Sequence, residues 1–148
     1  MKHLILLCCF VLTLRAQVPP FNAAGVTMGH HHLIVPDPAV HKKIWVEVLG
    51  AQASGNPGLD FLKLPGALLV LSQGNPSGGS EGTSLDHFAF AAREYDATRD
   101  KLAAAGVKIS NERTQGQKEF VAMFPDGVKV EFYEDLMLAT PIAHHHLH

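Results

Sequence analysis

Three histidines in succession, His30, His31 and His32, are the residues whose chemistry stands out in this sequence. They precede the apolar residues 33–35, so we expect them on a β-strand. Side chains alternate between the faces of a strand, which places His30 and His32 on one face and His31 on the other. Imidazole nitrogens bind divalent metal ions and exchange protons near neutral pH. The run therefore predicts metal-binding or proton-transferring groups on one face of a sheet.

His87 and Glu131 also interrupt apolar stretches. Glu131 lies between Val130 and Phe132, in a segment that alternates as a half-buried strand does. A carboxylate that points into an enclosed sheet needs a partner, and a metal ion is a suitable one. A lone histidine on a strand is more often a structural residue whose hydrogen bonds are satisfied. His87 is therefore a candidate metal ligand only in combination with Glu131.

The composition is that of a globular protein with an ordinary surface. The chain has 148 residues, 47% hydrophobic and 18% charged, which suits one domain or two small packed modules. Its net charge of −2 predicts no nucleic-acid partner. Six of the ten histidines fall in the clusters 30–32 and 144–146, so the excess of histidine is local.

Residues 1–16 resemble a signal peptide, with a positive start, an apolar run and a cleavage position after Ala16. An uncleaved anchor or a misassigned start is the alternative. Cys8 and Cys9 both lie in this segment, so the mature chain has no thiol for metal binding, nucleophilic attack or disulfide formation. These features predict a secreted or periplasmic protein, with no membrane contact once the segment is removed.

Two series of elements follow an extended lead-in at residues 17–26. The first series is a strand at 29–35, a helix capped by Asp37 and stopped by Gly50, a loop or short strand at 51–57, and strands at 59–64 and 67–73. The glycine-rich residues 74–83 look like a flexible connection that could move over a site. The second series is a strand at 85–91, a helix from an Asp96 cap to Ala105, and strands at 107–109, 119–124 and 128–133.

The two series form an internal repeat. From His30 to Gly50 is 20 positions, and from His87 to Gly106 is 19. Each series reads as a βαβββ module, at residues 27–73 and 84–136, that cannot bury its sheet alone. The sequence therefore predicts an α+β fold in which the two modules pack on each other.

The motifs of this repeat resemble the vicinal oxygen chelate family, which includes glyoxalase I, extradiol dioxygenases, methylmalonyl-CoA epimerase and the fosfomycin- and bleomycin-resistance proteins. The likeness spans residues 27–136. It rests on three motifs: His30-x6-Asp37, Leu85-Asp86-His87, and Phe124-Pro125-Asp126-Gly127-x3-Glu131. It implies that the two modules form a curved mixed sheet that encloses a cleft, with a metal ion inside.

The resemblance implies that His30, His87 and Glu131 bind this metal. The fourth position of the family, on the last strand of module one, falls at Leu71, beside Val70 and Ser72. Leucine cannot bind a metal, so we expect an open site of two histidines and one glutamate. Such a site suits Fe(II), Mn(II), Zn(II) or Ni(II) and leaves positions for water or for two vicinal oxygens of a substrate.

His32 and Tyr133 are the candidate catalytic residues. His32 should share its strand face with His30, as a general base, a substrate contact or a rival first ligand. Tyr133 follows Glu131 by two positions and should face the same cleft, where it could donate a hydrogen bond to a bound oxyanion. Lys129 faces the same way near the rim, whereas His41 is interpreted as a surface residue.

These residues favour a metal-dependent lyase, isomerase or dioxygenase acting on a small, vicinally oxygenated molecule by Lewis-acid activation. The alternative is a metal-free module of the same fold that sequesters a small molecule. A third hypothesis is a structural domain with a filled cleft. The family likeness also implies a homodimer. The tail at 137–148 repeats the histidine run of the first strand, and we interpret it as a last strand that pairs back onto the domain, outside the metal site. The remnant of a purification tag and a truncated third module are the alternatives.

Overall fold

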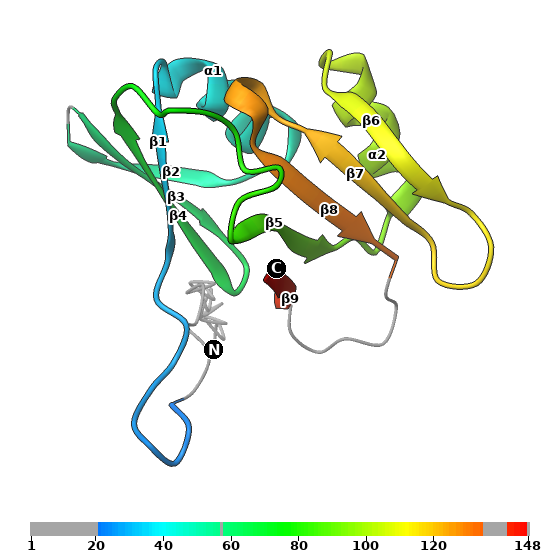
Figure 1. Ribbon diagram of the computed structural model, residues 1–148, viewed down its shortest axis with the longest axis horizontal. Coiled ribbons are helices and arrows are strands. Elements are labelled where there is room, and N and C mark those ends of the chain that lie inside the picture. Colours follow the sequence, from blue (N-terminus) through cyan, green and yellow to red (C-terminus); the bar gives the residue numbers. More distant parts are fainter. Residues whose placement is uncertain (1–20, 57, 135–141, 148) are drawn as a thin grey trace, which may run out of the picture.

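The computed structural model describes residues 21–56, 58–134 and 142–147 (Figure 1). The predicted signal peptide lies outside this range. The first module contains β1 (His31–Val35), α1 (Pro38–Lys42), the π-helical turn Lys43–Val48, β2 (Gln52–Asn56), β3 (Leu59–Leu64) and β4 (Ala67–Gln73). The second contains β5 (Leu85–Ala91), α2 (Tyr95–Ala104), β6 (Lys108–Arg113), β7 (Glu119–Met123), the 3-10 turn Pro125–Gly127 and β8 (Lys129–Tyr133), and is followed by β9 (Ile142–Leu147).

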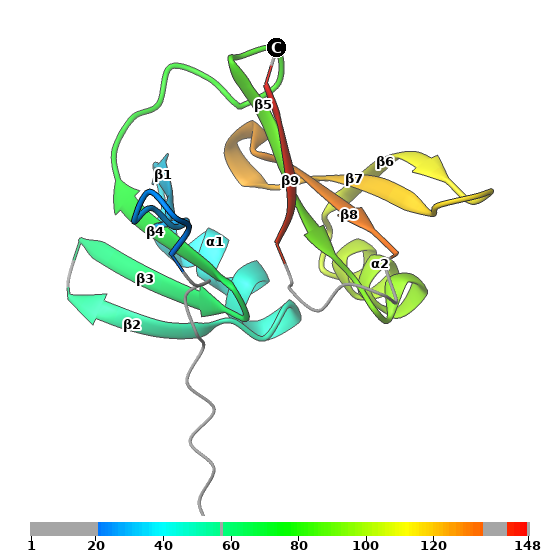
Figure 2. The ribbon, with the colours of Figure 1, turned by 90° about the horizontal axis from the view of Figure 1, so that it is seen from below.

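The predicted pair of βαβββ modules is confirmed. The first sheet has the order β1-β4-β3-β2, and the second has the order β6-β7-β8-β5-β9. In each module the first strand runs parallel to the last, β1 beside β4 and β5 beside β8, and the other pairs of the module are antiparallel. Within the described residues no strand pairing joins the two sheets, and β9 pairs with the edge of β5 opposite to β8 (Figure 2).

One face of each sheet packs on the helices and forms a shared core. Leu69 and Leu71 of the first sheet and Phe88 and Phe90 of the second are buried with Trp45, which is fully buried. These residues alternate with others along their strands, as expected when one face of a strand is covered. The residues between them therefore point to the opposite face of each sheet.

The caps differ between the two helices. Asp37 accepts a hydrogen bond from the Ala39 N–H at 2.9 Å, which confirms the predicted N-cap of the first helix. The predicted cap at Asp96 is wrong, because α2 begins at Tyr95 with Glu94 in the cap position. Asp96 lies inside the first turn of α2, where its negative charge interacts favourably with the helix dipole but its side chain accepts no capping hydrogen bond.

None of the described helices is long and apolar enough to cross a membrane.

The end of the glycine-rich connection is docked on the second module. The Ser80 N–H donates to the Gly127 carbonyl at 2.9 Å, and the Ser80 hydroxyl accepts from the Lys129 N–H at 2.8 Å. A Cβ at Gly79 would come within 2.4 Å of the Gly127 carbonyl oxygen, so the two backbones meet closely here. These contacts attach the connection to the beginning of β8.

His41 is fully buried, so its interpretation as a surface residue is wrong. Its Nε2 lies 3.0 Å from Asp126 Oδ2, which joins the first helix to the turn before β8 across 85 positions of sequence. Asp126 has a φ of +60°, a conformation that aspartate tolerates better than most residues. The buried imidazole thus links the two modules.

Candidate metal site

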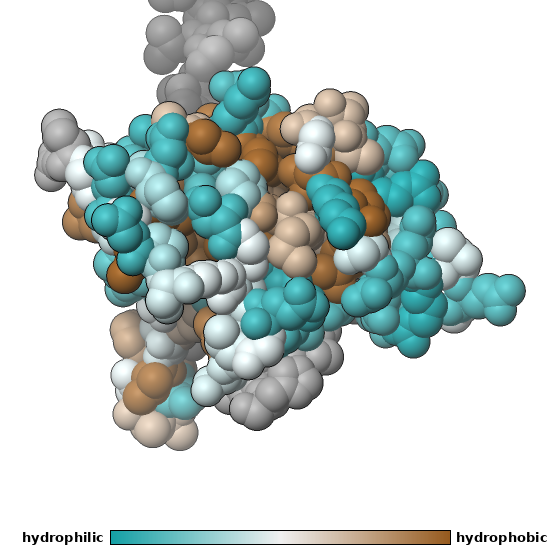
Figure 3. Space-filling model, turned by 45° about the horizontal axis from the view of Figure 1, so that its top comes forward, coloured by the Kyte–Doolittle hydropathy of each residue, from teal (hydrophilic) through white to brown (hydrophobic). Residues whose placement is uncertain are grey.

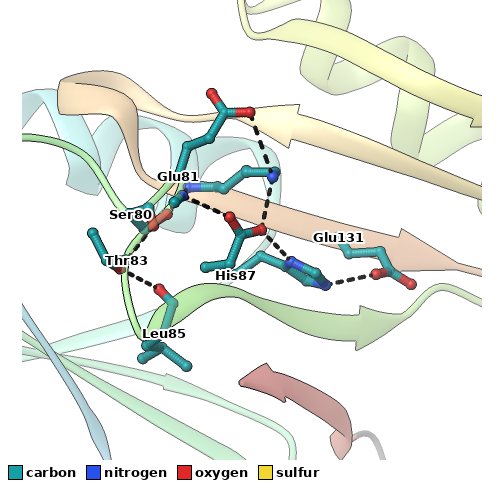
Figure 4. A network of polar contacts seen from close by, with 9 residues as sticks. Ser80, Glu81, Thr83, Leu85, His87 and Glu131 are labelled. Carbon is teal, nitrogen blue, oxygen red and sulfur yellow. Dashed lines mark hydrogen bonds and ion pairs between the residues drawn. The ribbon is translucent and has the colours of Figure 1, made fainter. Parts of the chain in front are cut away.

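Two adjacent strands of the second sheet bring His87 and Glu131 together. In the parallel pair β5–β8, Ala89 is opposite Glu131, so Glu131 shares its sheet face with Ala89 and His87. Both side chains are buried, each residue 7% exposed, on the face turned away from the helices. His87 Nε2 lies 3.0 Å from Glu131 Oε2 (Figure 4). The structure thus brings these two residues of the predicted site together.

Asp86 contacts the other nitrogen of the same imidazole. His87 Nδ1 lies 2.8 Å from Asp86 Oδ1 (Figure 4). A carboxylate only accepts hydrogen bonds, so Nδ1 carries a proton, and Nε2 is the nitrogen that faces Glu131. Metal-binding histidines commonly have this kind of carboxylate partner, which fixes the tautomer and the orientation of the ring.

A local irregularity of β5 explains how two consecutive residues can contact each other. Side chains of neighbouring strand residues normally point to opposite faces. Here Leu85 pairs with Leu147 and His87 pairs with His146, so Asp86 is an extra residue of β5 between two consecutive residues of β9. Such a bulge redirects a side chain, and bulges are frequent beside functional sites.

Lys129 and the backbone of the connection hold Asp86 in its charged form. The Lys129 ammonium donates to Asp86 Oδ1 at 2.7 Å, and the Gly82 N–H donates to Asp86 Oδ2 at 2.8 Å. These bonds, with the one from His87, lower the pKa of Asp86 far below its ordinary value. The same bond to Asp86 raises the pKa of Lys129, which also lies 3.6 Å from Glu81 (Figure 4). Asp86 is therefore a fixed negative charge behind His87.

The first-strand histidines do not join this pair. His30 immediately precedes β1 and is exposed. His32 is also exposed, and its Nε2 lies 2.9 Å from the Ser72 hydroxyl of the neighbouring strand. His31 points to the opposite face of the strand, as predicted, where its ring stacks on the buried Phe88 with centroids 4.7 Å apart. Among the residues whose side chains the structure describes, no three His, Cys, Asp or Glu residues form a group that could hold a metal.

The position proposed for a fourth ligand is shifted by one residue. Leu71 is fully buried in the core that faces the helices, not on the face of His32. The sheet register pairs His32 with Val70, as it pairs Ala89 with Glu131. Val70 therefore corresponds to Glu131 when His30 is matched to His87. Leu71 lies as many positions after Pro65 as Glu131 lies after Pro125, but the turn at Pro65 is shorter than the 3-10 turn that begins at Pro125. An error of one position along a strand places the side chain on the opposite face of the sheet. Valine cannot bind a metal, so the expectation of an open site stands.

Tyr133 lies on the same strand face as Glu131, two positions further along β8, and is 5% exposed. Sequence reasoning placed Lys129 only near the rim, and assigned no role to Asp86 or Ser80. The adjacency of an aspartate and a histidine in Leu85-Asp86-His87 was visible. Without the bulge, however, alternation would have sent the two side chains to opposite faces.

Two pockets lie on the helix side of the sheets, away from His87. One of about 370 Å³ lies between the modules and is lined by residues that include Trp45, Leu64, Phe90 and Phe132. The other, of about 420 Å³, is lined by residues that include Ile44, Val107 and Phe124. Figure 3 shows apolar side chains gathered in the middle of the face it presents, with hydrophilic residues to either side. Neither of these two pockets includes the candidate metal ligands.

The chain is an α+β protein of two paired βαβββ modules. Its candidate site places an imidazole and a carboxylate on adjacent parallel strands. The sequence matches the family "Glyoxalase/Bleomycin resistance protein/Dioxygenase superfamily" over residues 27–132. The chain therefore belongs to this superfamily, as the sequence motifs predicted. None of the curated proteins compared with the chain matches it.

Solved structures of similar fold include fosfomycin resistance proteins. FosX from Mesorhizobium loti has a TM-score of 0.63 at 17% identity, covering 74% of this chain and 92% of that one. FosX from Listeria monocytogenes, complexed with Mn(II) and 1S,2S-dihydroxypropylphosphonic acid, has a TM-score of 0.62 at 20% identity, covering 74% and 90%. A glyoxalase family protein from Enterococcus faecalis has a TM-score of 0.59 at 21% identity, covering 72% and 96%. At these identities the likeness establishes the fold.

Proposed function

We propose that the chain is a metal-dependent enzyme of the glyoxalase or dioxygenase type, acting on a small molecule with vicinal oxygens. The observation that carries this proposal is the buried set Asp86–His87–Glu131, in which a carboxylate fixes the imidazole and a second carboxylate meets its Nε2. His87 and Glu131 would hold a divalent ion. The Mn(II) in the structure of the similar Listeria FosX supports this class of cofactor.

The donor set fits a divalent ion. Metal–ligand distances of ~2.0–2.2 Å place two neighbouring ligand atoms of one ion about 3.0–3.4 Å apart. His87 Nε2 and Glu131 Oε2 are 3.0 Å apart. Since Nδ1 carries the proton, a neutral His87 would direct the lone pair of Nε2 toward an anionic oxygen, which is repulsive unless a proton or a cation lies between them. A metal ion removes this repulsion.

When bound, the ion would supply Lewis-acid stabilisation of a negative oxygen on the substrate. Asp86 and Lys129 would keep His87 in its metal-binding tautomer throughout. The Tyr133 hydroxyl, on the face of Glu131, would donate a hydrogen bond to the substrate oxyanion. His32 of the first sheet would accept or return a substrate proton. His30 remains the predicted first-strand ligand.

The metal-free sequestration module is the second candidate. It is favoured by the direct contact of His87 with Glu131 and by the absence of a three-ligand group among the described side chains. In that case the apolar pocket between the modules, next to Trp45 and Phe132, would bind the ligand. His87 and Glu131 would then stabilise the sheet as a buried ion pair.

Metal analysis and ligand binding separate the two candidates. The purified full chain, loaded with Fe(II), Mn(II), Zn(II) or Ni(II) and desalted, should retain about one equivalent, and Glu131→Gln should retain much less. Glu134→Gln is a matched control, because Glu134 lies outside β8 and contacts only Lys118 among the described ion pairs. Retention by wild type of less than about a third of an equivalent for every metal would contradict the enzyme proposal and favour sequestration.

The location and assembly of the protein belong to the same proposal. We propose export to the periplasm or the medium on the basis of residues 1–16. A small-molecule substrate and a homodimer follow from the family alone. Fractionation of cells that express the full chain, with N-terminal sequencing of the exported form, would test export.

A further inference from the structure

The pocket of about 370 Å³ between the modules lies on the opposite side of the second sheet from His87. Phe90 and Phe132 form part of its wall, and both belong to the core that packs on the helices. Phe132 follows Glu131 directly along β8, so alternation sends the two side chains to opposite faces of the sheet. A ligand in this pocket would therefore occupy a site separate from the candidate metal site.

The wall of this pocket is aromatic and aliphatic. The rings of Trp45, Phe90 and Phe132 line it, together with Leu49 and Leu64. These rings follow one another, with centroids 5.8 Å apart for Trp45 and Phe90 and 6.0 Å apart for Phe90 and Phe132. Transfer of an apolar ring from water to such a wall is favourable, and aromatic rings also pack well on one another. The volume is within the range of about 300–1,000 Å³ that is typical of small-molecule pockets.

Two cationic side chains lie at the pocket without a carboxylate partner. Arg93 and Lys101 both line it and are exposed, and neither forms an ion pair with any side chain that the structure describes. Arg99 of α2 differs, because its guanidinium lies 2.6 Å from Glu112 and it does not line this pocket. Arg93 and Lys101 are therefore available to an anion that enters the pocket.

The other polar groups of the lining favour a single negative charge. Glu94 is the one acidic residue that lines this pocket, so its lining carries an excess of one positive charge. Thr98 also lines it, three positions before Lys101 on the same side of α2. A carboxylate accepts hydrogen bonds from a guanidinium, an ammonium and a hydroxyl group. A cationic ligand would find only Glu94, beside two groups that repel it.

We propose that this pocket binds a small aromatic carboxylic acid as its anion. The ring of the ligand lies on the aromatic wall, and Arg93, Lys101 and the Thr98 hydroxyl hold its carboxylate. The inference does not depend on the proposed enzyme, because this second site works whether or not a metal ion binds on the other face of the sheet. The ligand contacts both modules at once, since Trp45 belongs to the first module and Phe132 to the second. Its binding therefore also stabilises the packing of the two modules.

The fluorescence of Trp45 tests the inference, because Trp45 is the single tryptophan of the chain and lines the pocket. The full chain is titrated with phenylpropionate in the presence of EDTA, which removes any metal that the carboxylate could bind. Phenylpropanol and phenylpropylamine carry the same ring with a neutral or a positive end, and N-acetyltryptophanamide corrects for collisional quenching.

Four variants locate the binding site. Arg93→Gln and Lys101→Gln each remove one positive charge, and Thr98→Phe fills the pocket. Lys63→Gln is the matched control, because Lys63 is an exposed lysine of β3 that does not line the pocket. Circular dichroism verifies that each variant is folded.

We expect a saturable change of the fluorescence with phenylpropionate, half complete below about 1 mM, and binding of both analogues that is weaker by about 10-fold or more. Arg93→Gln and Lys101→Gln should each weaken the binding of phenylpropionate by about 3–10-fold. Thr98→Phe should abolish it, whereas Lys63→Gln should stay within about 2-fold of wild type.

Three results would overturn the inference. Binding of phenylpropanol or phenylpropylamine as tight as that of phenylpropionate would show that the pocket does not select an anion. Unchanged binding in Thr98→Phe, or in both Arg93→Gln and Lys101→Gln, would place the ligand elsewhere on the chain. A titration of the wild type without saturation would show that the pocket does not hold an aromatic acid. None of these results bears on metal binding, which the retention of metal after desalting tests separately.

Discussion

Asp86 and His87 are consecutive residues of one strand, yet Asp86 Oδ1 lies 2.8 Å from His87 Nδ1. The bulge between β5 and β9 makes this contact possible, because it breaks the alternation of side chains at Asp86. Lys129 and the Gly82 N–H hold the carboxylate from the other side. The imidazole is therefore oriented before any ligand arrives, which lowers the conformational cost of metal binding.

The first prediction concerns the orientation of His87. Asp86→Asn removes the negative charge behind the imidazole and allows the other tautomer, so we expect Mn(II) affinity to fall by about 10–100-fold. Asp96→Asn is the control, because Asp96 is a mostly exposed carboxylate on α2 whose ion pair with Lys118 is long at 3.4 Å. Titration calorimetry measures both. Equal affinities for wild type and Asp86→Asn would show that the carboxylate does not orient the ring.

The second prediction is a pH dependence of stability in the metal-free chain. The bond from Lys129 lowers the native pKa of Asp86 below its ordinary value of 3.8, so the unfolded state binds the proton first as the pH falls. The stabilisation by Asp86 is therefore complete above about pH 4 and decreases below it. Urea unfolding in EDTA should show a gap between wild type and Asp86→Asn that is constant from about pH 5 to 7 and narrows toward about pH 3. A gap that widens at low pH would contradict this assignment.

The third prediction tests the docking of the glycine-rich connection. Gly79→Ala places a methyl group against the Gly127 backbone, with 2.4 Å between its Cβ and the carbonyl oxygen, so we expect a loss of about 1–3 kcal/mol in the free energy of unfolding. Gly78→Ala is a matched control, because a Cβ there meets nothing within 4 Å. Thermal or urea unfolding gives the comparison. If the two variants are equally stable, the connection is not docked on Gly127 in solution.

The fourth prediction concerns the link between the modules. Asp126→Ala removes the acceptor for the fully buried His41, which should cost about 1–3 kcal/mol in the free energy of unfolding. Asp126→Asn keeps an acceptor oxygen and tolerates the positive φ, so it should cost much less. Equilibrium unfolding measures both losses. Similar losses for the two variants would mean that the backbone conformation, and not the contact with His41, matters at this position.

The sequence predicts the secondary structure well where periodicity is strong. Strands at 59–64, 67–73 and 85–91 have the predicted bounds, because alternating or continuous apolar residues between turn signals leave little freedom. The helix after Asp37 begins as predicted but continues as a π-helical turn. The α-helical and π-helical hydrogen-bond patterns are similar, and the composition of the segment does not distinguish them. The N-cap of α2 is Glu94 and not Asp96, two residues earlier than predicted, because an aspartate in the first turn resembles one at the cap.

The candidate site, like the secondary structure, was predictable from the sequence only in part. The sequence by itself determined the two modules and the residue types of the site, because strand parity and the repeat depend only on local spacing. The family resemblance implied that His87 and Glu131 share a site, and the pairing of β5 with β8 brings them together. Only the tertiary structure decided that Asp86 supports His87, that His41 is buried, and that the histidines of β1 stay apart from Glu131. A bulge, a pairing between distant strands and the packing of two modules depend on contacts far apart in the chain. The place of β9 beside His87 is the clearest case, because residues 59 positions apart become neighbours only through strand pairing.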